Sequence, residues 1–194
     1  MAHRASSASA EPAPAGSLLV RFLQAERGAT AVEFGIVAAP FIYLLMAILE
    51  LAIVFWTSQV LETAVANASR QIYTGQFQQS AANVGIPPEQ RLANFKQAVC
   101  SHVRALFDCN AKLDVDVRSF SSFAEATVPR PIRTSDGTYD PSGFGYMPPT
   151  ANQIMIVRAS LEYPVFVSLL APFTGLSNGN RLIMASATFR TEPY

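Results

Sequence analysis

Four side chains of types that bind metals lie close together in the sequence: Cys100, His102, Asp108 and Cys109. They do not fit a zinc centre, because residues two apart on a helix point to different faces and no second Cys-x-x-Cys or His pair completes four ligands. The two cysteines are the only ones in the chain, and this even count favours a disulfide. In an unbroken helix they would be about 13 Å apart, whereas a disulfide needs Cα atoms within about 7 Å. The bridge therefore predicts that the helix ends or turns between them, near 107–110.

No other group of residues has the spacing of an active site. A histidine-dependent triad would rest on His102, because the only other histidine is His3, and no Gly-x-Ser-x-Gly elbow is present. A glycine-rich phosphate-binding loop is also missing from the sequence. Asp136 and Asp140, with the glycines around them, admit a calcium loop, but a plain turn is the simpler interpretation. The sequence predicts a protein that is not an enzyme and has neither a metal nor a cofactor.

Charge and length narrow the class of protein. Fourteen Lys and Arg residues balance fourteen Asp and Glu residues in the 194-residue chain. Without an excess of positive charge, nucleic-acid binding loses the attraction that usually dominates its affinity. The length suits one modest domain of about 100 to 150 residues plus an anchor. We therefore expect one exposed domain and no nucleic-acid partner.

Residues 35–56 form an apolar run of twenty-two residues with a single charge, Glu50. A helix of this length crosses a hydrocarbon core of about 30 Å, so we predict one transmembrane helix in contact with membrane lipid. The alternative is a buried helix of a soluble protein. Arg21 and Arg27 precede the run, whereas the next basic residue is Arg70, so the positive-inside rule places the amino terminus in the cytoplasm.

A cleavable secretory signal is the main alternative to a permanent anchor. Ala64-Val65-Ala66 has the small-x-small form that signal peptidase accepts. However, the apolar run exceeds the roughly 7 to 15 residues of an ordinary signal core, and many polar residues precede it. Trp56, at the end of the run, instead suits the headgroup region of a membrane.

Polar and small residues interrupt the apolar run. An ionised Glu50 at the bilayer centre would cost roughly 2.5 to 3.5 kcal/mol, so this residue is protonated, reaches an interface where it stays wet, or meets a partner from another chain. Pro40 lacks a backbone donor and is expected to bend or open the first turns. Gly35 and Ala39 form a small-xxx-small pair that lets another helix approach closely, although this spacing is common by chance.

Immediately before the apolar run, the chain reads Arg27-Gly28-Ala29-Thr30-Ala31-Val32-Glu33-Phe34. One interpretation is a helix that begins at the membrane surface, with Glu33 near the headgroups and favourably close to the positive end of the helix dipole.

The junction also resembles the cleavage site of type IV prepilins, in which a membrane aspartic peptidase cuts on the cytoplasmic side after a glycine and leaves glutamate as mature residue five. Glu33 is fifth when Ala29 is counted as the first residue. Together with Pro40, Glu50 and the small-residue helix that follows, residues 27–70 are more specifically similar to the TadE-like pseudopilins of tight-adherence (Tad, or Flp) pilus systems.

The resemblance implies a role for each residue of the junction. Cleavage after Gly28 would free an ammonium group on Ala29, and Glu33 of a neighbouring subunit would pair with it in lipid, where water is scarce. Phe34, where Flp pilins usually carry tyrosine, and the long carboxy-terminal part favour a minor pilin-like component over the bulk filament subunit. The implied partners are the prepilin peptidase, sister pseudopilins, the Flp pilin and the inner-membrane assembly platform.

The rest of the chain predicts an α+β domain. Helical spacing continues past the membrane to Thr74, and Gly75 provides a stop. A second helix begins at Pro88, and its apolar face comprises Leu92, Phe95, Val99, Val103 and Leu106. Period-two alternation then predicts strands of an antiparallel sheet at 112–120, 154–167 and 181–190. Helices followed by strands suggest a head in which the helices cover one face of the sheet.

The connection 129–150 is rich in proline and glycine. Its aromatic residues Tyr139, Phe144 and Tyr146 form a contact surface or cover the sheet, and the sequence does not decide between the two.

We therefore predict three parts: a cytoplasmic leader (1–28), a transmembrane and extended helix (29–74), and a periplasmic α+β head (75–194) in which oxidation of the cysteines is expected. The resemblance implies a minor pilin-like component of a Tad/Flp-type pilus assembly machine in the bacterial inner membrane, which supports pilus biogenesis and surface adherence. The alternative is a membrane-anchored periplasmic binding or enzymatic domain with no role in pili.

Overall fold

The computed structural model describes residues 26–103, 108–167 and 175–193, with side chains from Thr30 onward. The chain divides into two compact units, Met1–Leu45 and Met46–Tyr194. Helix α2, Glu26–Tyr73, contributes its first part to one unit and its second part to the other.

In the first unit, the described residues are helical and almost all of their side chains are exposed. From Thr30 to Leu45 only Ala38 is half-buried. Pro40 lies inside α2, which continues through it as one helix. This part of α2 therefore has a surface of apolar side chains that its own unit does not cover.

In the second unit, α2 changes from an exposed apolar helix to one that packs on a core. Its buried side chains recur at spacings of three and four residues, which places them on one face: Leu61, Ala64, Val65, Ala68 and Ile72. The helix ends at Tyr73, where Gly75 adopts a positive φ of 76°, as a glycine stop requires. The carboxy-terminal segment returns to this point, because the Glu192 N–H donates to the Tyr73 carbonyl at 3.2 Å.

Three further helices connect α2 to the sheet. They are α3, Gln76–Gln79; α4, Pro88–Cys100; and α5, Cys109–Lys112. Helix α4 begins with proline in its first turn, as predicted, and buries Phe95 and Val99. Phe77 of α3 is also buried, with its ring edge-on to Phe95 at 5.5 Å between centroids.

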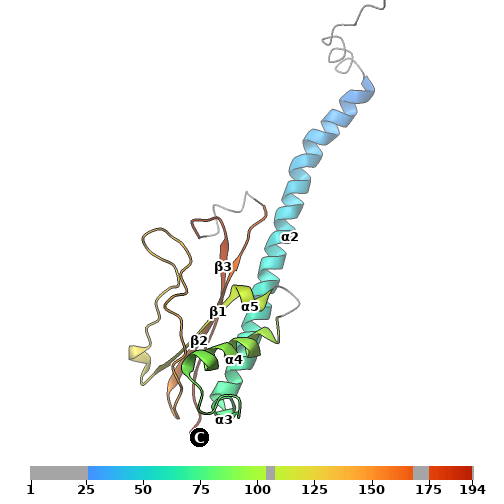
Figure 1. Cartoon of the computed structure of the whole chain (residues 1–194). Helices are drawn as coiled ribbons and strands as arrows, with labels where there is room; N and C mark the ends of the chain where they lie inside the picture. Colours follow the sequence, from blue (N-terminus) through green and yellow to red (C-terminus); the bar gives the residue numbers. More distant parts are fainter. Residues whose placement is uncertain (1–25, 104–107, 168–174, 194) are drawn as a thin grey trace, which may run out of the picture. The chain divides into compact units, whose positions relative to one another are not determined.

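The sheet is an antiparallel meander of three strands in the order β1-β2-β3. The strands are β1, Leu113–Phe120; β2, Ile154–Tyr163; and β3, Arg181–Arg190, with a short 3-10 turn, η1 (Phe123–Glu125), after β1. One face of the sheet, which carries Val115 of β1, Ala159 of β2 and Ala185 of β3, shares the core with α2 and α4. Within this unit Figure 1 shows both helices on one side of the sheet.

The connection between β1 and β2 lies on the other side of the sheet (Figure 1). It joins the edge of β1 through a parallel bridge between Val117 and Tyr146, in which Val117 N–H donates to the Gly145 carbonyl and Met147 N–H donates to the Val117 carbonyl, each at 2.8 Å. As a result β1 is buried on both faces at its centre.

The α+β class, the long apolar helix and the three antiparallel strands agree with the predictions from sequence. Two predicted boundaries were wrong. The second helix ends at Cys100, so Val103 is buried from the turn that follows it, and Leu106 lies outside the described residues. The second strand ends at Tyr163 instead of Val167, because Pro164 cannot donate to the ladder. The short helix α3 was not predicted at all.

Candidate functional site

Much of the surface of α2 is apolar and exposed. Within the described residues, α2 is the one helix long and apolar enough to cross a membrane, and only 11% of its most apolar stretch is buried. This low burial distinguishes it from the core helix of a soluble protein, whereas a signal sequence near the amino terminus has a similar length and apolar composition. Its exposed apolar side chains include Phe34, Ile42, Leu49, Phe55 and Trp56.

The junction residues lie at the start of α2. Gly28 and Ala29 belong to the helical backbone, but their surroundings lie outside the described side chains. Glu33 is exposed. Gly35 and Ala39 are exposed as well, and a Cβ built on Gly35 would meet no described atom within 4 Å. The predicted helix-contact face is therefore not covered by any part of the chain that the structure describes.

Glu50 has a partner within its own chain. Its side chain is only 6% exposed, and its two carboxylate oxygens accept backbone N–H groups of Phe166 and Val167, each at 2.7 Å. This residue is therefore not a wet surface acid in the structure. It fastens the start of the β2–β3 connection to α2, and a contact of Glu50 with another helix stays a prediction.

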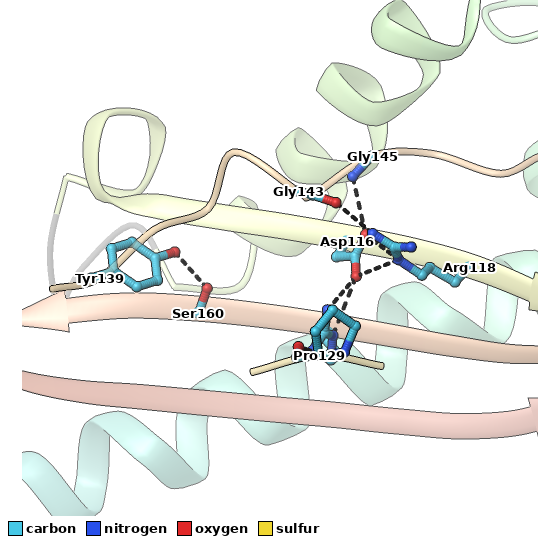
Figure 2. A network of polar contacts seen from close by, with 8 residues as sticks. Asp116, Arg118, Pro129, Tyr139, Gly143, Gly145 and Ser160 are labelled. Carbon is cyan, nitrogen blue, oxygen red and sulfur yellow. Dashed lines mark hydrogen bonds and ion pairs between the residues drawn. The ribbon is translucent and has the colours of Figure 1, made fainter. Parts of the chain in front are cut away.

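A second polar site lies under the β1–β2 connection (Figure 2). Asp116 of β1 is fully buried, and its carboxylate accepts hydrogen bonds from three sources: Arg158 Nη2 at 2.6 Å and Nε at 3.3 Å, Arg118 Nε at 3.1 and 3.2 Å, and the Gly145 N–H at 3.0 Å. Both guanidinium groups also bind the β1–β2 connection. Arg158 donates to the Pro129 carbonyl at 2.6 Å, and Arg118 donates to the Gly143 carbonyl. Every charge in this cluster is paired, and the cluster contains no nucleophile with a base.

The aromatic residues of the connection complete its attachment. Phe144 covers the guanidinium of Arg158, with 5.1 Å from Cζ to the ring centroid. The Tyr139 hydroxyl donates to Asp114 Oδ2 at 2.8 Å and lies 2.6 Å from the Ser160 hydroxyl. Burial, together with Asp114, raises the pKa of Tyr139 well above its ordinary value. Of the two interpretations left open by the sequence, these contacts support a cover for the sheet.

Asp136 and Asp140 stabilise turns in the same connection. Asp136 Oδ1 accepts the Thr138 N–H at 3.0 Å, Asp140 Oδ1 accepts the Ser142 N–H at 3.0 Å, and both acids form ion pairs with Arg133. Among the described residues, no group of three or more His, Cys, Asp and Glu side chains is arranged to hold a metal ion.

The two cysteines form a disulfide, with 5.6 Å between the Cα atoms of Cys100 and Cys109. The predicted change of direction between them therefore occurs, but α4 ends at Cys100 itself, earlier than expected. Asp108 caps the following helix α5 by accepting the Ala111 N–H at 3.4 Å.

Sequence reasoning missed two of these contacts, the buried Asp116–Arg158 pair and the anchoring of the β2–β3 connection by Glu50. For the first, the available signal was a lone arginine in the apolar stretch of β2, opposite an acid in β1. For the second, the sequence carried only the acid, because its partners are backbone groups 116 and 117 residues further along the chain.

Comparison with known proteins finds one family. Residues 28–70 match the model of the TadE-like protein family, and neither curated proteins nor solved structures match the chain. The matched residues begin at the glycine of the junction and extend through the exposed part of α2 into the part that packs on the head. Over residues 28–70, the chain is therefore similar to the TadE-like protein family, as the junction motif indicated.

Proposed function

We propose that this protein is a minor, pilin-like component of a Tad/Flp-type pilus assembly machine, which supports pilus biogenesis and surface adherence without a catalytic role of its own. The observation that carries the proposal is the TadE-like match over residues 28–70, which contains the glycine, the glutamate at position five and the exposed apolar helix in one stretch. Its partners are sister pseudopilins, the Flp pilin and the inner-membrane assembly platform.

The proposed topology is a single pass through the bacterial inner membrane, with the leader in the cytoplasm and the head in the periplasm. The helix has the length and surface for one crossing. Arg21 and Arg27 before it favour a cytoplasmic amino terminus. The disulfide between Cys100 and Cys109 supports an oxidising compartment for the head, since such bonds are rare in the cytosol.

The proposed maturation step is cleavage of the peptide bond after Gly28 by the prepilin peptidase. The new ammonium group of Ala29 then pairs with Glu33 of a neighbouring subunit, which sets the axial register between subunits. The exposure of Glu33 supports this assignment, because a carboxylate used within the chain would not be free to meet a neighbour. The open Gly35–Ala39 face supports close approach of a second helix at the same level.

Secretion after cleavage at Ala66 is disfavoured by the core of the head. Ala64 and Val65 are buried there together with Leu61. Removal of residues up to 66 would strip these side chains from the face of the sheet and expose apolar surface, at a cost of about 25 cal/mol per Å².

Mass spectrometry of the mature amino terminus tests the proposal. A chain that starts at Ala29 supports it, an intact chain removes the cleavage step, and a start at Asn67 shows secretion instead. Replacement of Gly28 by a bulky residue should block both processing and piliation, whereas Gly35→Ala, at an open position, should leave processing unchanged. If Gly28 variants are still processed and piliated, the site is wrongly assigned. If deletion of the whole protein leaves pili unaffected, the chain is a membrane-anchored domain of another function.

A further inference from the structure

The start of the β2–β3 connection is fastened to α2 at Glu50. Residues 164–167 follow the end of β2, and Pro164 has no N–H to give. Further along, the N–H groups of Phe166 and Val167 both donate to the carboxylate of Glu50 at 2.7 Å. An irregular segment is thereby held against a level of the helix that is otherwise apolar.

Along α2, the contact of Glu50 with Phe166 and Val167 lies within the predicted membrane span. Glu50 precedes Trp56 by six residues, which is about 9 Å along a helix. Large exposed apolar side chains surround this level on α2: Leu49, Leu51, Ile53 and Phe55. If Trp56 lies among the headgroups, residues 164–167 lie at the depth of the adjoining acyl chains.

The side chains and backbone contacts of residues 164–167 suit the depth of the acyl chains. The Phe166 side chain is 77% exposed, and its ring lies edge-on to Tyr163 with 6.4 Å between centroids. Irregular backbone is tolerated in a membrane only where its polar groups find partners inside the protein. Glu50 supplies such partners, and the two N–H groups in turn stabilise a carboxylate that would otherwise be isolated in an apolar stretch.

We propose that residues 164–167 are a second membrane-contacting element, which Glu50 holds in place and which inserts Phe166 into the outer leaflet of the bilayer that α2 spans. The proposal rests on the membrane insertion of α2 stated under Proposed function. Its partner is a lipid surface. The head is thus tethered to the membrane at two points of the chain, α2 and the Phe166 segment.

The experiment uses tryptophan as a depth probe in the full-length protein. The wild type contains one tryptophan, Trp56, so the variant Trp56→Phe/Phe166→Trp carries a single probe in the segment. Both proteins are reconstituted into phosphatidylcholine vesicles that contain lipids brominated at a known acyl position. Quenching by bromine is compared with quenching by iodide added to both sides of the membrane.

A matched control places the probe far from the membrane. Phe123 is 70% exposed and follows the Phe120 end of β1, which pairs with Ile154 at the opposite end of β2 from Tyr163. The two ends are roughly 30 Å apart along the strand. In Trp56→Phe/Phe123→Trp, the probe should be quenched by iodide and not by brominated lipid.

We expect bromolipid quenching of the Phe166→Trp probe to be at least threefold stronger than that of the Phe123→Trp probe, and iodide quenching to be weaker. Equal behaviour of the two probes, with Trp56 of the wild type still quenched by lipid, overturns the proposal and leaves the membrane helix intact. Failure of lipid to quench Trp56 as well overturns the insertion of α2 itself.

Adding Glu50→Ala to the Phe166 probe tests the anchor. The bromolipid quenching should fall by about half or more, whereas Glu50→Gln, which keeps one acceptor oxygen, should retain more of it. Unchanged quenching in Glu50→Ala would show that Glu50 does not hold the segment in the bilayer.

Discussion

Asp116 and Arg158 face each other across β1 and β2, and neither is more than 5% exposed. The carboxylate accepts hydrogen bonds from Nε and Nη2 of the guanidinium, and the third nitrogen, Nη1, donates to the Pro129 carbonyl in the β1–β2 connection. The pair therefore attaches the β1–β2 connection to the sheet that it covers. Its two residues are 42 positions apart in the sequence.

Removing Asp116 should destabilise the head strongly. In Asp116→Ala, the Arg158 charge stays buried without its main partner, and we expect a loss of about 3 to 5 kcal/mol in the free energy of unfolding. The measurement is a urea titration of the full chain in mild detergent, followed by near-ultraviolet circular dichroism. Asp136→Asn, at an exposed turn, is the matched control and should have a much smaller effect, because solvent screens its ion pair with Arg133.

The double variant Asp116→Leu/Arg158→Met separates charge from packing. Replacing both partners removes the unpaired charge, so part of the stability lost in Asp116→Ala should return. A double variant less stable than Asp116→Ala would show that the contacts to Pro129 and Gly145 matter more than the ion pair.

Local patterns in the sequence were sufficient for much of this fold. The apolar run and its small-residue extension predict α2, Pro88 predicts the start of α4, and alternation predicts the three strands, because each depends on neighbours a few residues away. The cover over the second sheet face was not predictable in this way. Asp116 alternates like a surface residue in β1, and its burial is decided by a connection that begins after the strand has ended.

The candidate site shows the same difference between local motifs and contacts of distant residues. Gly28, Glu33 and the Gly35–Ala39 pair are visible as a local motif, and the roles proposed for them involve other molecules. The partners of Glu50 are backbone N–H groups, which every non-proline residue has, so no sequence pattern distinguishes Phe166 and Val167 as the donors.

Side chains on the face of α2 that packs against the sheet should not tolerate replacement by larger ones. Ala68 is fully buried, whereas Ala66, two residues earlier on the same helix, is exposed. Ala68→Leu should lower the free energy of unfolding by about 1 to 3 kcal/mol through overpacking. Ala66→Leu adds the same atoms on the outer face, and a change within about 0.5 kcal/mol is expected in the same urea titration. Equal effects of the two substitutions would contradict the packing of α2 described for the head.

The disulfide should stabilise the head by constraining the unfolded chain. Closing a loop across nine positions corresponds to about 2 to 3 kcal/mol, so Cys100→Ala/Cys109→Ala should lose about this amount. Mass spectrometry after alkylation should find two labelled cysteines only when the native protein has first been reduced. Labelling without reduction would show that the cysteines are free in the protein as isolated.

From the contacts of Asp140 we predict that the stability of the head depends on pH in the acid range. Hydrogen bonds from Ser142, and then Arg133, lower the pKa of Asp140 from 3.8 to about 2. Because the folded state holds this proton less tightly, the contribution of Asp140 is present above about pH 4 and is lost as the pH falls toward 2. The difference in Tm between wild type and Asp140→Asn should therefore be constant above pH 4 and shrink below it. A difference that is the same at pH 2.5 and pH 6 would contradict this assignment.

Glu33 should matter for assembly and not for the fold or membrane insertion of a single chain, because its carboxylate is exposed. In Glu33→Gln, processing after Gly28 and flotation with membranes should continue, while crosslinking to sister pseudopilins and the number of pili per cell should fall about tenfold, which corresponds to about 1.4 kcal/mol of lost attraction. Glu62→Gln, at an exposed acid further along α2, is the control and should leave both readouts unchanged. Should Glu33→Gln assemble as well as the control, a carboxylate–ammonium pair cannot be what sets the register between subunits, and the open Gly35–Ala39 face would remain as the candidate contact.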